Sequence, residues 1–146
     1  MYGMVLFCCI DEFEHFVYNN PTCGPEERNG FWMHLEEKYG LGTVGDGASK
    51  GEMEGRGWQD WEVIFSLPFY SIGYALSEVS AQQFWMKASC DRAGAISDYI
   101  NFCKASASSS FPDLLEVGKL RSPFQSGILE ELVAYGREWV KKYTHP

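Results

Sequence analysis

Residues 58–85 read WQDWEVIFSLPFYSIGYALSEVSAQQFW, and this stretch decides the fold class that the sequence predicts. After Pro68, apolar side chains recur at helical spacing, which predicts one long helix from Pro68 to about residue 89. The apolar positions assigned to this helix include Phe69, Ile72, Leu76, Val79, Phe84 and Met86. On such a helix, Tyr70 and Tyr74 are expected to lie one turn apart and to share a face.

The segments on both sides of this stretch have helical patterns of their own. Apolar spacing and breaker residues predict helices over residues 2–19, 25–39, 92–105, 111–117 and 123–142. Pro25 and Gly40 are expected to mark the ends of the second helix, and Asp91 and Ser110 are expected N-caps. Residues 122–125 are expected to form a capping box for the last helix. From that helix the residues expected to face inward are Phe124, Ile128, Leu132, Tyr135 and Trp139. No alternating strand pattern occurs, so the predicted class is all-α.

A length of 146 residues fits one domain, and residues 1–146 are predicted to form a single helical domain. Residues 40–57 hold seven glycines and are predicted to form a loop or an ordered crossover. The sequence does not support a phosphate-binding role for this segment. The sequence has no G-x-x-x-x-G-K-[ST], and the Gly-x-Gly at 40–42 follows a helix and not a strand.

Charge and cysteine usage limit the possible partners and compartments. The formal net charge of −8 repels phosphate backbones, so nucleic acid is not an expected partner. The five cysteines match no disulfide or metal spacing, which favours buried structural thiols in a reduced, intracellular protein. The apolar start MYGMVLFCCI is too short to span a bilayer and lacks the basic region of a signal peptide, so no membrane partner is expected.

Direct searches for catalytic motifs are negative. The sequence has no H-E-x-x-H and no G-x-S-x-G, and His15, His34 and His145 do not lie at metal-ligand spacing. Structural or surface roles are expected for these histidines, and no metal ligand is assigned. Tyr70 and Tyr74 differ, because two phenols on one helical face could donate hydrogen bonds to a developing oxyanion. The alternative, which the pattern alone favours, is that both rings pack in a core with their hydroxyl groups satisfied.

Three stretches of the chain, taken together, resemble one family. They are IDEFEHFVYNNPTCGPEER, WQDWEVIFSLPFYSIGYALSEVSAQQFW and AISDYINFCKASASSSFPDLLEVGKL, in that order. The most specific piece is Phe-x-x-Pro-Phe-Tyr-x-x-x-Tyr-Ala, which begins at Phe65 and ends at Ala75. From Ile10 to about Leu120, the chain resembles the C-terminal portion of zinc metallopeptidases of the oligoendopeptidase F and thimet oligopeptidase group.

This resemblance implies a helical C-terminal part of a larger α-helical metallopeptidase catalytic domain, a cytoplasmic location and hydrolysis of short peptides. It assigns Tyr74 to stabilising the tetrahedral intermediate and Tyr70 to lining the substrate channel. It also implies zinc. The family holds zinc with H-E-x-x-H and a later glutamate, which this chain lacks, so the chain alone is not expected to be active. The alternatives are a non-catalytic module that binds peptides or proteins, and a relic without a present function.

Two departures from the family pattern remove hydrogen-bond donors that family members place beside the substrate. Glu62, Val63 and Ile64 stand where family members usually carry a histidine, and Ser71 stands where many carry a tyrosine. Losing one oxyanion donor typically costs about 100- to 1000-fold in rate. In an intact family fold, residues 1–19 would be covered by helices that this sequence does not include. An exposed apolar patch is therefore expected there, with self-association or binding of a missing N-terminal half.

Overall fold

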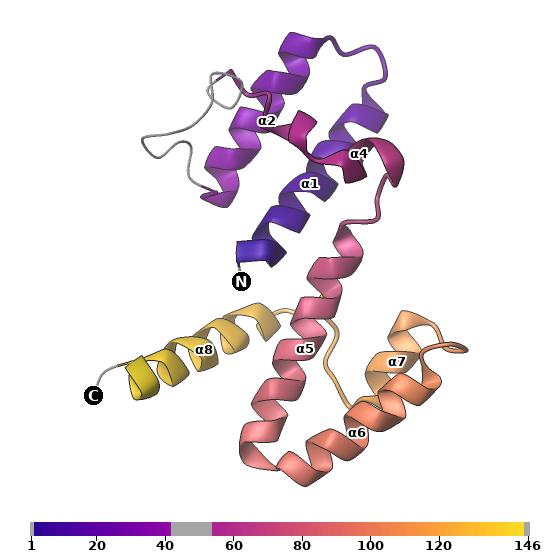
Figure 1. Cartoon of the computed structure of the whole chain (residues 1–146), viewed down its shortest axis with the longest axis vertical. Coiled ribbons are helices and arrows are strands. Elements are labelled where there is room, and N and C mark those ends of the chain that lie inside the picture. Colours follow the sequence, from indigo (N-terminus) through magenta and orange to yellow (C-terminus); the bar gives the residue numbers. More distant parts are fainter. Residues whose placement is uncertain (1, 42–53, 145–146) are drawn as a thin grey trace. The chain divides into compact units, whose positions relative to one another are not determined.

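The computed structural model describes residues 2–41 and 54–144 (Figure 1). Within these ranges every regular element is a helix and no strand occurs, which confirms the predicted all-α class. The elements run in the order α1 Tyr2–Asn19, α2 Pro25–Tyr39, the 3-10 helix η1 Gly57–Asp60, α4 Glu62–Ser66, α5 Ile72–Cys90, α6 Arg92–Ala105, α7 Phe111–Val117 and α8 Ile128–Thr144. Most of the predicted loop at 40–57 lies outside the described residues, as does His145.

The chain divides into two compact units, Met1–Leu76 (unit 1) and Ser77–Pro146 (unit 2). The division falls inside α5, whose first residues belong to unit 1 and whose remainder belongs to unit 2. That the whole chain forms a single domain stays a prediction.

The core of unit 1 is built by α1, α2 and η1. Cys9, Ile10 and Phe13 of α1 are fully buried, as their helical spacing predicts. The ring of Phe13 lies at the centre, with its centroid 5.2 Å from those of both Trp32 and Trp58. Other apolar side chains of α1 pack against this core while partly buried, namely Leu6, Phe7 and Val17. Unit 1 itself therefore covers part of the apolar surface of α1.

Local capping residues determine both ends of α2, as the sequence predicts. Pro25 lies in the first turn, and the side chain of Glu27 accepts the N–H of Gly24 at 2.9 Å. At the other end Gly40 adopts φ 61°, a left-handed conformation that glycine reaches without a steric penalty.

The long helix predicted to open after Pro68 begins only at Ile72, so the predicted start is wrong. The short helix α4 ends at Ser66, and residues 67–71 form a bend and turn before α5 begins. Two short helices, η1 and α4, precede the predicted long helix and were not predicted from the sequence.

The turn before α5 is held by a contact from α1. Phe69 adopts φ 62°, which a right-handed helix cannot contain. Its N–H donates to Glu14 Oε1 at 3.1 Å and not to a carbonyl of a preceding helical turn. Tyr70 consequently precedes the helix, whereas Tyr74 lies in its first turn. The prediction that the two tyrosines share one helical face is therefore wrong.

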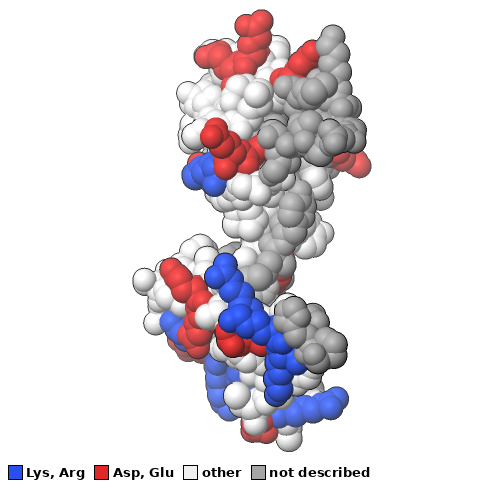
Figure 2. Space-filling view, turned by 90° about the vertical axis from the view of Figure 1, so that its left-hand side faces the viewer, with Lys and Arg blue, Asp and Glu red and all other residues white. Residues whose placement is uncertain are grey.

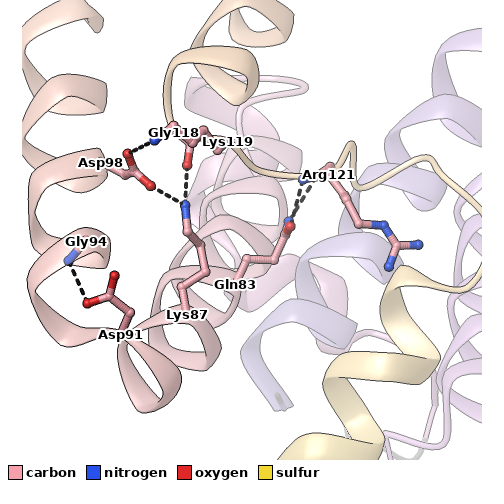
Figure 3. A network of polar contacts seen from close by, with 8 residues as sticks. All are labelled: Gln83, Lys87, Asp91, Gly94, Asp98, Gly118, Lys119 and Arg121. Carbon is pink, nitrogen blue, oxygen red and sulfur yellow. Dashed lines mark hydrogen bonds and ion pairs between the residues drawn. The ribbon is translucent and has the colours of Figure 1, made fainter.

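In unit 2 a buried carboxylate joins α5, α6 and the segment after α7 (Figure 3). Lys87 Nζ donates to Asp98 Oδ2 and to the carbonyl oxygen of Gly118, each at 2.8 Å. Lys119 Nζ lies 2.8 Å from the other oxygen of Asp98. The hydrogen bonds from Lys119 and Lys87 lower the pKa of Asp98 below its ordinary value, so this carboxylate stays ionised at neutral pH.

The segment leading to α8 is attached to α5 through a side-chain amide. Gln83 accepts the backbone N–H of Arg121 at 2.8 Å and donates to the carbonyl of the same residue at 3.0 Å (Figure 3). Gln83 is buried, and both its amide oxygen and its amide nitrogen have a backbone partner.

Two of the three predicted caps in unit 2 are confirmed. Asp91 accepts the N–H of Gly94 at 3.0 Å, and the side chain of Ser110 accepts the N–H of Asp113 at the start of α7. The capping box at 122–125 is wrong, because α8 begins at Ile128. Gly127 precedes it with φ 85°, which ends any helical path from residue 123.

The inward face predicted for the last helix is correct only in part. Ile128 and Leu132 are buried, and Tyr135 is half-buried. Trp139 is 41% exposed, and Phe124, which lies outside α8, is 78% exposed. The predicted set of inward-facing residues therefore extends too far at both ends.

The two units differ strongly in charge. Unit 1 has twelve acidic and four basic residues, whereas unit 2 has eight of each, so unit 1 carries the whole formal charge of −8. On the face drawn in Figure 2, acidic side chains are scattered over unit 1 and lysine and arginine side chains gather on unit 2. In the described ranges, none of the helices has the length and apolar character that crossing a membrane requires.

Candidate functional site

The two tyrosines singled out by the sequence lie together on the surface of unit 1. Their ring centroids are 5.3 Å apart and the rings meet edge to face. The ring of Phe7, from α1, stacks on Tyr74 with a centroid distance of 5.0 Å. Tyr70 is 52% exposed and Tyr74 is 49% exposed, so neither ring is a core residue. The fold thus presents both phenols to solvent on a rigid aromatic support.

The hydroxyl group of Tyr74 is protonated at neutral pH and interacts with Tyr70. A side-chain hydrogen bond with Tyr70 raises the pKa of Tyr74 above its ordinary value, and the nearby charge that Tyr70 can carry acts in the same direction. A phenol with a raised pKa remains protonated at neutral pH. Tyr74 can therefore donate its proton in a hydrogen bond to an oxyanion, but it is a poor nucleophile.

Glu14 anchors the turn that carries Tyr70. This residue is only 1% exposed, and its Oε1 accepts the Phe69 N–H described above. No described residue provides a hydrogen-bond partner for its Oε2. Burial raises the pKa of Glu14, and the Phe69 hydrogen bond opposes this shift. The rings of His15 and Tyr18 pack on Phe69 at centroid distances of 5.0 and 4.9 Å, so α1 holds the turn by polar and aromatic contacts.

Glu14 and Phe7, which hold the turn and the ring of Tyr74 in place, were not predicted from the sequence. Glu14 was detectable as a charged residue within a helix whose neighbours Ile10 and Phe13 face the core. Its partner, however, lies 55 positions away in the chain, and no local pattern identifies such a partner. The stacking of Phe7 on Tyr74 is equally remote in sequence.

The two departures from the family pattern have different surroundings. Ser71 is 1% exposed, and its Oγ has no hydrogen-bond partner among the described residues. A hydroxyl buried in this way cannot reach a ligand at the surface. Glu62 is exposed on α4, while Val63 and Ile64 are half-buried. Neither position adds a second exposed donor beside Tyr74.

The described residues do not form a metal centre. Among them, no group of three or more histidine, cysteine, aspartate or glutamate side chains could hold a metal ion. His15 lies 3.7 Å from Asp11, one helical turn away. The ring of His34 lies 6.1 Å from that of Phe31. The zinc that the resemblance implies therefore does not fit the described part of this chain.

The cysteines are free thiols in different environments. Cys9 and Cys23 are buried and Cys8 is half-buried, but Cys90 and Cys103 are exposed. The prediction of buried structural thiols is thus wrong for the two cysteines in unit 2. Burial is the largest of the effects that raise the pKa of Cys9 to about 12, so it is not a nucleophile at neutral pH.

Comparison with solved structures finds three similar chains. A protein described as oligoendopeptidase F, solved by X-ray crystallography, is 36% identical with a TM-score of 0.87, over 94% of this chain and 24% of that chain. PZ peptidase A, solved with an inhibitor, is 33% identical with a TM-score of 0.87, over 95% of this chain and 25% of that chain. A protein assigned as an oligoendopeptidase F from Bacillus anthracis str. Ames is 31% identical with a TM-score of 0.73, over 97% of this chain and 22% of that chain.

This chain therefore spans about a quarter of the length of the structures that it matches. No family model matches the sequence, and no curated protein matches it.

Proposed function

Because the chain belongs to the oligoendopeptidase F family, we propose that it forms the part of a peptide-binding cleft that faces the zinc in such enzymes. In this role Tyr74 donates a hydrogen bond to the oxyanion of the tetrahedral intermediate, and Tyr70 contacts the substrate. The observation that carries the proposal is the exposed pair of phenols, supported by Phe7 and by the turn that Glu14 anchors. The peptide substrate, the implied zinc and a cytoplasmic location are parts of this proposal.

The chemistry assigned to Tyr74 follows from its environment. An oxyanion is stabilised by a donor that is already oriented before charge develops, since no reorganisation is then needed. Phe7 and Tyr70 pack against the ring of Tyr74, and its phenol is protonated at neutral pH. Removing one such donor typically lowers kcat by about 100- to 1000-fold.

Hydrolysis also needs a zinc ion and a base, and the sequence has no H-E-x-x-H to supply them. We therefore propose that cleavage depends on a zinc-bearing segment outside the described residues. The test is to add a separately produced zinc-bearing segment of a related enzyme to this chain and to measure cleavage of a fluorogenic peptide. We expect activity only with both parts present, and a large loss of kcat in the Tyr74→Phe variant.

The matched control is Tyr143→Phe, which removes an exposed phenol from α8 in unit 2. We expect this variant to behave as the unsubstituted chain. Equal activity of Tyr74→Phe and the unsubstituted chain in the reconstituted mixture would remove Tyr74 from the mechanism. No activity in any mixture, combined with peptide binding, would favour the second candidate.

The second candidate is a module that binds peptides without cleaving them. The missing zinc motif favours it, as does the burial of Ser71, which leaves Tyr74 without a second donor from that position. Such a module would bind a peptide with an affinity that chelators do not change, and it would release the peptide intact. Mass spectrometry of the peptide after binding separates this candidate from the first.

A further inference from the structure

Unit 1 contains a pocket of about 280 Å³ whose lining does not include Tyr70 or Tyr74. Its apolar walls come from α1, η1 and α4 and consist of Phe13, Val17, Tyr18, Trp58, Ile64 and Phe65. The two charged residues that complete the lining are Glu14 and Arg28. Pockets that hold drug-sized ligands usually begin at about 300 Å³, so this one suits a single amino-acid-sized group.

The aromatic walls form a closed floor and an open mouth. Phe13 is fully buried and Trp58 is 7% exposed, so these two rings form the floor. Tyr18 is 57% exposed and Phe65 is 60% exposed, which places them at the entrance. The indole N–H of Trp58 already donates to Asn29 at 3.0 Å, so the floor needs no polar group from a ligand. An apolar side chain can therefore enter between the rings and displace water from them.

Arg28 differs from the other described cations of unit 1. Lys38 pairs with Glu12 at 2.6 Å, and Arg56 pairs with Glu54. Arg28 forms no ion pair with any described residue, although unit 1 has twelve acidic residues. The polar contact of its side chain is from Nε to the sulfur of Cys23, at 3.4 Å. Among the described residues, none pairs with its two terminal nitrogens, and a guanidinium group suits bidentate binding of a carboxylate.

Glu14 does not convert this pocket into a cation site. Its Oε1 is occupied by the Phe69 N–H, and its Oε2 is buried from solvent. Of the two charged residues in the lining, Arg28 is therefore the one with groups left to pair with an anionic ligand. Burial raises the pKa of Glu14, so its negative charge is less favourable here than in water.

We propose that this pocket binds the C-terminal residue of a peptide. The large apolar side chain of that residue inserts between the aromatic rings, and its carboxylate pairs with Arg28. The proposal does not depend on the function proposed for the tyrosines, because it rests on different residues and requires no cleavage.

The test uses the full chain and two probes that differ in one group, N-acetyl-L-phenylalanine and its C-terminal amide. Binding is followed by NMR through the indole N–H of Trp58, which is assigned with a Trp58→Phe variant. We expect the acid to shift this signal in a saturable way and the amide to bind about ten- to a hundredfold more weakly. The indole signal of Trp139, in unit 2, is expected not to move.

Three variants locate the two halves of the ligand. Arg28→Gln is expected to weaken the acid about ten- to a hundredfold and to leave the amide unchanged, whereas Arg137→Gln makes the same change of charge on α8 and is expected to have no effect. Phe65→Ala is expected to weaken both probes, and because Phe65 is exposed, this variant is expected to fold. Equal binding of acid and amide, unchanged binding by Arg28→Gln, or no saturable binding would each overturn the proposal.

Discussion

The pKa of the Tyr74 hydroxyl depends on the adjacent phenol of Tyr70. The side-chain hydrogen bond with Tyr70 is the largest effect that raises the pKa of Tyr74. We expect Tyr70→Phe to lower the pKa of Tyr74 towards its ordinary value, because the substitution removes both the hydrogen bond and the nearby ionisable group. Titration of the tyrosine ring carbons by NMR measures this directly. Tyr143→Phe serves as the control, and an unchanged or higher Tyr74 pKa in Tyr70→Phe contradicts the pairing of the two hydroxyls.

Glu14 should make the stability of unit 1 depend on pH in a defined direction. Its pKa in the folded chain is raised, so the folded state binds the proton more tightly than the unfolded chain does. The stabilisation from this group is therefore complete below the unfolded pKa and is lost as the pH rises through the folded pKa. We expect the stability of the unsubstituted chain, relative to Glu14→Gln, to fall as the pH rises above the ordinary pKa of a glutamate.

Urea unfolding of both chains at a series of pH values provides the measurement for Glu14. The charges that act on this carboxyl come from Asp11, which raises its pKa, and His15, which lowers it. Both are unchanged in Glu14→Gln, so their own titration largely cancels in the difference between the two chains. A difference that stays constant with pH, or grows in the opposite direction, would show that Glu14 is ionised without a penalty in the folded chain.

At the scale of the helices, capping side chains define several ends, and their contribution can be measured. Asp91 accepts the Gly94 N–H, which has no partner inside α6. We expect Asp91→Ala to lower the free energy of unfolding by about 1 kcal/mol, whereas Asp91→Asn keeps an acceptor and should cost only a few tenths of this. Thermal unfolding followed by circular dichroism compares the two. An equal loss in both variants would assign the effect to the charge of Asp91 and not to the cap.

Whether a helix end depends on nearby or on distant residues explains which ends could be predicted from the sequence. The ends at Gly40, Asp91 and Ser110 were predicted correctly, because each depends on groups only a few residues away. The start of α5 could not be predicted, since the turn at Phe69 is held by Glu14 from a distant part of the chain. The tyrosine pair was found as a motif, but its edge-to-face geometry depends on that turn. The existence of the longer helices is thus encoded locally here, whereas the site geometry depends on tertiary contacts.

At the scale of the whole chain, the charge asymmetry between the units is the dominant electrostatic feature. Unit 1 carries the whole net charge, so its folded state is destabilised by repulsion among its acidic residues. Unit 2 is neutral and contains the ion pairs of Asp98 with Lys87 and Lys119. Salt screens both kinds of interaction, and it should therefore relieve repulsion in unit 1 while weakening attraction in unit 2.

We expect an increase in ionic strength from about 20 mM to about 150 mM to slow amide hydrogen exchange in α1 and α2. Exchange in α6 and α7 should be unchanged or faster under the same conditions, because the ion pairs there lose strength. Mass spectrometry of peptides from each unit measures both regions in one sample, so differences in concentration or handling cancel. Sucrose provides a control without charge, since it favours compact states regardless of their charge and should slow exchange in both units. If salt slows exchange equally in both units, its effect is not electrostatic, and the charge asymmetry has no consequence for their relative stability.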